Sequence, residues 1–146
     1  MGKQVFHLGP VGAGHAMKCI NNTITAMTFL AMAEGLMPGK KFGLDPDVMT
    51  DVLNHSTAMS WISRTHIKQR ITSRSFDDPF KLELMVKDFG IAMHPAQNLA
   101  LSLPLSVQGQ QLWDQARQLA AGGSSVSELV HWVEQSTGTE IISGLS

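Results

Sequence analysis

Apolar residues recur at steps of three and four between residues 15 and 36, the spacing of one face of an α-helix. The run covers about six turns, which is well beyond the usual length of a strand. Ala26 and Phe29 add apolar groups on other faces, and a helix that is apolar on several faces is usually central or lies between domains. We expect the Pro38-Gly39 pair to end this helix.

The rest of the chain is divided by proline, glycine and small polar residues into further helical segments. Asp45 and Pro46 have the residue types of an N-cap and a first helical position, so a helix is predicted from Pro46 to His55. A loop follows at 56–60. The other predicted helices are a short amphipathic one over 61–71 with Trp61, Ile62, Ile67 and Ile71 inward, one over 80–101 disturbed near His94-Pro95, one from Pro104 to Ala121, and a last one through Gln135 capped by Ser125 or Ser127.

Strand-like alternation is confined to a weak signal at Lys3–Leu8. The pattern therefore predicts an all-α fold of five to seven helices. With 146 residues, the chain has the length of one ordinary domain. The single cysteine, Cys19, excludes an internal disulfide framework, and no two of the six histidines have metal-ligand spacing on one helix, so no metal site is expected.

The charge balance is nearly neutral, with eleven Lys and Arg against twelve Asp and Glu. A binding surface for nucleic acid or for an acidic membrane is usually basic, so neither partner is expected. The opening residues MGKQVFHLGPVG lack the charged-then-apolar order of a signal peptide, which predicts a cytoplasmic protein.

The glycine-rich segment 9–14 (GPVGAG) precedes the long helix. Glycines at a helix start let a ligand approach free backbone amides, where the helix dipole favours an anion. The order G-x-x-G-x-G differs from the dinucleotide fingerprint, and His15 stands where a P-loop has lysine. A flexible entry into the helix, without a ligand, remains the alternative.

Lys18 and Asn22 follow Gly14 at steps of four residues and share a stripe with it, with Thr25 less well aligned. The stripe offers an amine, an amide and a hydroxyl beside the possible anion site, a combination suited to proton exchange with a substrate hydroxyl or carbonyl. A lysine on a solvated face is the alternative. For the Lys87-Asp88 pair, the alternative to a functional role is an ordinary surface salt bridge.

Two blocks of sequence carry a resemblance to a known family. GPVGAGHAMKCINN (9–22) resembles the G-x-x-G-x-G-x-x-x-K-x-x-N-N motif of the β-hydroxyacid dehydrogenases, and FKLELMVKDF (80–89) resembles their F-x-x-x-L-M-x-K-D-L segment. That family includes 3-hydroxyisobutyrate, tartronate semialdehyde and threonate enzymes. Its members have an N-terminal Rossmann domain and an all-α C-terminal domain of the 6-phosphogluconate dehydrogenase type, entered by one long helix. The resemblance implies that residues 1–146 are the helical domain alone, without the Rossmann domain.

The resemblance also assigns roles by position. Lys18 matches the catalytic lysine that exchanges a proton with the substrate, and Asn22 matches a substrate-binding asparagine. The backbone of Gly12, Ala13 and Gly14 would contact the same substrate, a small hydroxy acid. Phe80, Lys87 and Asp88 match residues near the cofactor, NAD or NADP, which the Rossmann domain would mainly bind.

The family likeness further implies homo-oligomers formed through the helical domain, and no activity for this domain alone. The segment STAMSW shares Ser60 and Trp61 with the GNSW of threonate-type members but lacks their Gly-Asn pair, which leaves the acid open. The alternative function is a non-catalytic helical interaction or oligomerisation module of the same fold.

Overall fold

The computed structural model describes residues 5–144, apart from the side chains of residues 96 and 97. Its helices are α1 (Ala13–Lys41), α2 (Pro46–Asn54), α3 (Trp61–Thr65), α4 (Leu82–Asn98), α5 (Pro104–Leu119) and α6 (Leu129–Thr137), with a π-helical segment at Ile67–Thr72 and a 3₁₀ turn at Val126–Glu128. Among the described residues there is no β-strand, and residues 5–8 of the strand-like segment are extended coil; Lys3 and Gln4 lie outside the described residues. The prediction of an all-α fold is confirmed.

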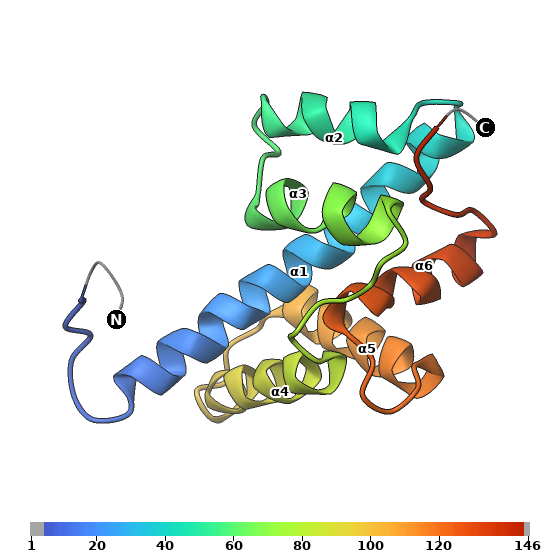
Figure 1. Cartoon of the computed structure of the whole chain (residues 1–146). Coiled ribbons are helices and arrows are strands. Elements are labelled where there is room, and N and C mark those ends of the chain that lie inside the picture. Colours follow the sequence, from blue (N-terminus) through green and yellow to red (C-terminus); the bar gives the residue numbers. More distant parts are fainter. Residues whose placement is uncertain (1–4, 145–146) are drawn as a thin grey trace.

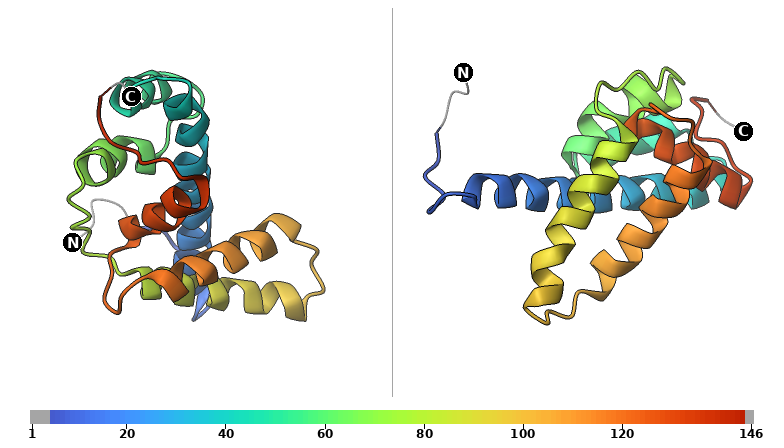
Figure 2. Two further views of the ribbon diagram at one scale, coloured as in Figure 1. Left: turned by 90° about the vertical axis from the view of Figure 1, so that its right-hand side faces the viewer. Right: turned by 90° about the horizontal axis from the view of Figure 1, so that it is seen from below.

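Helix α1 is the central element of the fold. It packs against α2, α3, α4, α5 and α6. In Figure 1, α2 and α3 lie on one side of α1, and α4, α5 and α6 lie on the other. Figure 2 shows that the N-terminal half of α1 extends beyond the other helices. The long helix is therefore both the centre of the fold and a projection from it.

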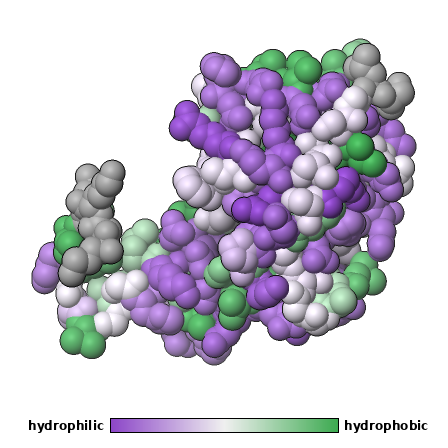
Figure 3. Space-filling view, in the orientation of Figure 1, coloured by the Kyte–Doolittle hydropathy of each residue, from purple (hydrophilic) through white to green (hydrophobic). Residues whose placement is uncertain are grey.

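Burial along α1 follows this division. Phe29 and Ala33 in the C-terminal half, and Ala26 just before the midpoint, are inaccessible to solvent. In the N-terminal half, Met17 and Ile24 are exposed although they are apolar. Figure 3 shows hydrophobic residues on the projecting part of the chain, at the lower left. The pattern of apolar groups on several faces correctly predicted a central helix, but in its N-terminal half one face with Met17, Ile20 and Ile24 is left exposed, whereas Cys19 is buried.

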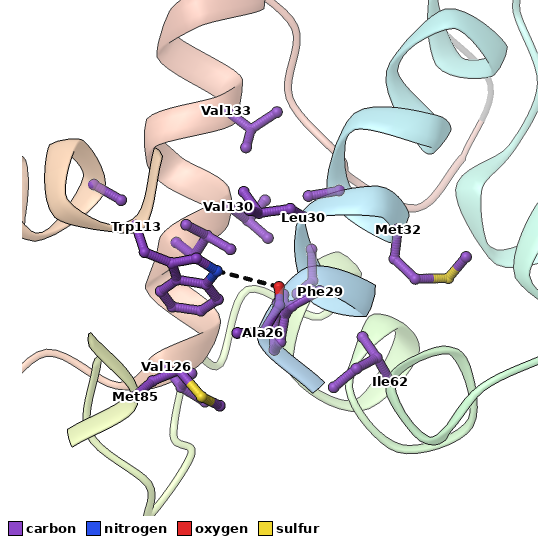
Figure 4. Close-up of a cluster of buried hydrophobic side chains, with 14 of the residues drawn as sticks. Ala26, Phe29, Leu30, Met32, Ile62, Met85, Trp113, Val126, Val130 and Val133 are labelled. Carbon is purple, nitrogen blue, oxygen red and sulfur yellow. Dashed lines mark hydrogen bonds between the residues drawn. The ribbon is translucent and has the colours of Figure 1, made fainter. Parts of the chain in front are cut away.

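The core joins α1 to α5 and α6 around Trp113 (Figure 4). The indole of Trp113 is fully buried and packs edge-on against Phe29, with ring centroids 6.2 Å apart. Its Nε1 donates a hydrogen bond of 3.1 Å to the carbonyl oxygen of Ala26. A buried indole N–H requires a partner, and here the partner belongs to the central helix. This contact fixes α5 against the middle of α1.

The Pro38-Gly39 pair does not end α1, contrary to the prediction, because the helix continues to Lys41. Pro38 lies at the start of the last turn, where the loss of one amide donor disturbs little downstream structure. Its carbonyl still accepts from the Phe42 amide at 2.9 Å. A Cβ on Gly39 would lie 2.2 Å from Sδ of Met49, so this glycine permits α2 to approach closely.

Two further segments differ in detail from the predictions. The segment 61–71 is divided into α3 and the π-helical segment, and Trp61 is 71% exposed, so the prediction that Trp61 faces the core is wrong. Helix α4 passes through Pro95 and ends at Asn98. The Asp45 cap is confirmed, since its side chain accepts from the Asp47 amide at 2.7 Å. Ser125 forms a capping box with Glu128 at the start of the last helical segment.

Candidate active site

Three residues of the predicted site meet between α1 and α4. Nζ of Lys18 lies 3.1 Å from Oδ2 of Asp88, and Nδ2 of Asn22 donates a hydrogen bond of 2.6 Å to the same oxygen. The predicted stripe therefore exists for Lys18 and Asn22, which share a face of α1. The Lys87-Asp88 pair is not the ordinary surface salt bridge of the alternative interpretation, because Asp88 is buried and its ion pair is with Lys18.

The burial of these side chains differs in a way that suits a reacting lysine. Asp88 is 5% exposed, because α4 turns it inward together with Met85 and Phe89. The side chain of Lys18 is 56% exposed. A buried carboxylate that accepts from two donors holds both of them in place. Losing either contact would leave a buried acceptor without a partner, which costs free energy of folding. The anchored lysine keeps its remaining donors directed to solvent, where a substrate can reach them.

The glycine-rich segment forms the entry to α1. Gly12 is the N-cap residue and has φ +97°, a left-handed conformation that side chains other than glycine rarely adopt. A Cβ built on Gly12 or Gly14 would meet no atom within 4 Å. The amide of Ala13 donates to the carbonyl of Pro10 at 3.1 Å and is therefore already paired. Substrate contacts at Gly12, Ala13 and Gly14 stay a prediction.

A pocket of about 570 Å³ lies next to the Lys18–Asp88 pair. Asn22 belongs to both, because it bonds to Asp88 and also lines the pocket, as does Thr25 one turn further along α1. Phe80 and Trp61 contribute aromatic walls from the far side. The outward position of Trp61 thus has a physical reason: its ring lines this pocket and not the core.

The polar end of the pocket is a cluster that the sequence analysis missed. Nε2 of His66 lies 2.8 Å from Oδ2 of Asp78, and Nε of Arg70 lies 3.2 Å from the same oxygen. Arg70 also pairs through Nη1 with Asp77. Burial lowers the pKa of His66, the positive charge of Arg70 acts in the same direction, and Asp78 opposes both. His66 and Arg70 stand four residues apart, a spacing that could have indicated a shared face.

Among the described residues there is no group of three His, Cys, Asp or Glu side chains that could hold a metal ion. No helix in the described part of the chain has the length and apolar character needed to cross a membrane.

Comparison with known proteins shows the family of this chain. The family described as NAD-binding of NADP-dependent 3-hydroxyisobutyrate dehydrogenase matches residues 12–133. The chain belongs to this family. The match contains both α1 with Lys18 and Asn22 and α4 with Asp88, and it confirms the resemblance seen in the sequence.

Individual proteins with similar sequences or structures are named as dehydrogenases. The chain is 29% identical to 2-(hydroxymethyl)glutarate dehydrogenase of Eubacterium barkeri over 99% of this chain and 48% of that protein. It is 33% identical to 3-hydroxyisobutyrate dehydrogenase of Pseudomonas aeruginosa over 77% of this chain and 40% of that protein. Among solved structures, 3-hydroxyisobutyrate dehydrogenase of Salmonella typhimurium superposes with a TM-score of 0.75 at 25% identity, covering 83% of this chain and 42% of that one. The chain spans less than half the length of these relatives.

The residues matched to the cofactor fit an anionic nucleotide of the kind that the family description names. Lys87 is exposed on α4, and within the described residues it has no recorded ion-pair partner, so its ammonium is available to a phosphate or carboxamide oxygen. The half-buried ring of Phe80 lines the pocket, whereas Lys87 does not. Asp88, the third matched residue, contacts Lys18 and Asn22 instead. Cofactor contacts of Phe80, Lys87 and Asp88 stay a prediction.

Proposed function

We propose that this chain is the helical part of an NAD(P)-dependent hydroxyacid dehydrogenase in which Lys18 is the general acid and base. The observation that carries the proposal is the buried Asp88 of α4, which holds both Lys18 and Asn22 from one face of α1. A nucleotide-binding Rossmann domain, absent from these 146 residues, would complete the protein. This part is proposed to be the C-terminal domain of the 6-phosphogluconate dehydrogenase type.

The chain's own residues have distinct tasks in this reaction. Bound nicotinamide supplies the site that accepts or returns the hydride. In oxidation, the Lys18 amine takes the proton of the substrate hydroxyl as the neighbouring C–H bond breaks, and the hydroxyl carbon becomes a carbonyl. In reduction, the Lys18 ammonium returns that proton to the carbonyl oxygen. Asp88 positions Nζ, and the amide of Asn22, fixed by the same carboxylate, binds the substrate oxygen.

The projecting half of α1 supports an assembly larger than this chain. Ile24 is 61% exposed, Met17 and Ile20 are also exposed on the same half-helix, and Val11 is fully exposed just before the helix begins. A contiguous apolar surface near a catalytic lysine is expected to be covered by another domain or subunit. We propose that the Rossmann domain and a second copy of the chain cover this half of α1.

The test uses the complete protein that contains this segment. We expect NAD(P)-dependent oxidation of one acid among 3-hydroxyisobutyrate, glycerate, serine and threonate, and a loss of about 10²–10⁴-fold in kcat for Lys18→Ala. Lys41→Ala is the matched control, because Lys41 is an exposed lysine in the last turn of the same helix. This 146-residue chain alone should show no turnover. Equal loss in both variants would refute the role of Lys18.

The exposed apolar half of α1 also favours the second candidate, a non-catalytic interaction or oligomerisation module. Such a module needs the apolar residues and not the ammonium. Absence of turnover with every acid, together with an assembly that survives Lys18→Ala but not Ile24→Glu, would favour this candidate over the dehydrogenase.

A further inference from the structure

The pocket beside Lys18 is larger than the reacting end of a small hydroxy acid requires. Its volume of about 570 Å³ lies within the range of about 300–1,000 Å³ that holds ligands of drug size. Its lining includes Asn22, next to the anchored lysine, and also His66, Arg70 and Asp78. The ring of His66 packs against Phe29, about two turns beyond Asn22 on α1. A substrate whose hydroxyl faces Lys18 would therefore extend its tail toward that cluster.

The cluster at the far end carries more negative than positive charge. Arg70 is its single cation, whereas Asp77 and Asp78 both pair with it. The lowered pKa of His66 keeps the imidazole neutral at pH 7, so it does not add a second positive charge. The formal charge of the four side chains is then −1. Asp78 is 7% exposed, so solvent screens its carboxylate only weakly.

The same side chains offer both kinds of hydrogen-bonding group. Arg70 uses Nε and Nη1 for the two aspartates, and the described residues provide no recorded partner for Nη2. Asp78 presents only acceptors. A hydroxyl group can accept from Arg70 and donate to Asp78, whereas a carboxylate can only accept and adds a like charge.

We propose that this pocket selects hydroxy acids with an uncharged, hydroxylated tail and rejects those with a second carboxylate at the far end. The inference rests on the proposed function and names the substrate class of that site. Trp61 and Phe80 would flank the carbon chain of the tail. The cluster of His66, Arg70 and Asp78 would form hydrogen bonds with the group at the end of the tail.

The test compares threonate with tartrate, two four-carbon acids that differ only in whether carbon 4 is an alcohol or a carboxylate, each in both stereochemical series. We expect the complete protein to have a kcat/KM about a hundredfold higher for the alcohol, because like-charge juxtaposition is strongly unfavourable. Asp77, which is 68% exposed and outside the pocket lining, gives the four side chains their net negative charge. Asp77→Asn removes that charge without changing a buried group, and should lower this ratio about tenfold. Asp114→Asn, an acid on α5 that pairs only with Arg117 among its recorded contacts, is the control and should leave the ratio unchanged.

Binding to the pocket is measured separately, by the fluorescence of Trp61 on addition of each acid, with Trp61→Phe to identify the signal. If no acid is oxidised, the proposed function fails, but quenching by threonate and not by tartrate would still support the selectivity of the pocket. Tartrate that reacts or binds as well as threonate would overturn the inference. A ratio unmoved by Asp77→Asn, or threonate that neither reacts nor binds, would overturn it equally.

Discussion

Replacing Asp88 by asparagine should separate the activity of the site from the stability of the fold. The change keeps the shape of the side chain and one acceptor oxygen, which the Asn22 amide can still use, but it removes the charge that attracts Lys18. Because Lys18 is 56% exposed, its ion pair contributes about 0–1 kcal/mol after solvent screening. Weakening the Asn22 bond from a charged to a neutral acceptor costs about 1 kcal/mol more. The free energy of unfolding should therefore fall by about 1–2 kcal/mol.

The expected loss of activity is larger, because misplacing a reacting group by about 1 Å can reduce the rate about 10²-fold. We expect kcat/KM of the complete protein to fall by that factor for Asp88→Asn, while urea denaturation shows only the small loss of stability. Glu83→Gln is the control, since Glu83 is an exposed acid one turn earlier on α4. Normal turnover in Asp88→Asn would refute the positioning role. A decrease of more than about 4 kcal/mol in the free energy of unfolding would show that Asp88 mainly stabilises the fold.

Three further predictions concern the fold. Trp113→Ala should lower the free energy of unfolding by about 3–5 kcal/mol, whereas Trp113→Phe, which loses the bond to Ala26 but keeps most of the apolar volume, should lose less than half of that in the same urea titration. Because the pKa of His66 is below 6.5 in the folded chain, its contribution to stability is complete above pH 6.5 and declines as the pH falls; the melting temperature should drop from pH 7.5 to 5.5, and less steeply in His66→Gln. Pro38→Ala restores an amide donor within α1 and should therefore raise the melting temperature. A lower melting temperature would contradict a helix that continues through residue 38.

Local patterns in the sequence predicted the elements whose causes are local. The Asp45-Pro46 start of α2 depends on one side chain and one ring, so it was predicted correctly. The stripe of Lys18 and Asn22 depends only on helical spacing. The end of α1 was misplaced because a proline near a helix terminus costs little, and the residue type does not reveal its distance from that terminus.

Features that depend on distant contacts could not be predicted from spacing. Asn22 and Asp88 are 66 residues apart, and their bond exists because α4 packs across α1. The sequence pattern marked the Lys87-Asp88 pair, but it could not show that Asp88 contacts Lys18 and Asn22. An apolar ring that lines a pocket has the same sequence pattern as one in the core, which is why Trp61 was assigned inward. The cluster of His66, Arg70 and Asp78 is formed by a turn of the chain after the π-helical segment, and no motif marks it.

The continuity of α1 makes the position of Lys18, the proposed acid and base, sensitive to small tilts of the helix. Lys18 stands eight residues before Ala26, where the helix enters the core, and this separation corresponds to about 12 Å along the axis. A tilt of about 5° at Ala26 would displace Lys18 by about 1 Å, enough to disturb its 3.1 Å contact with Asp88. The packing of Phe29 and Trp113 near Ala26 therefore determines where the Lys18 amine lies. Interior packing would thereby align Lys18 for the proposed reaction, although that side chain lies outside the core.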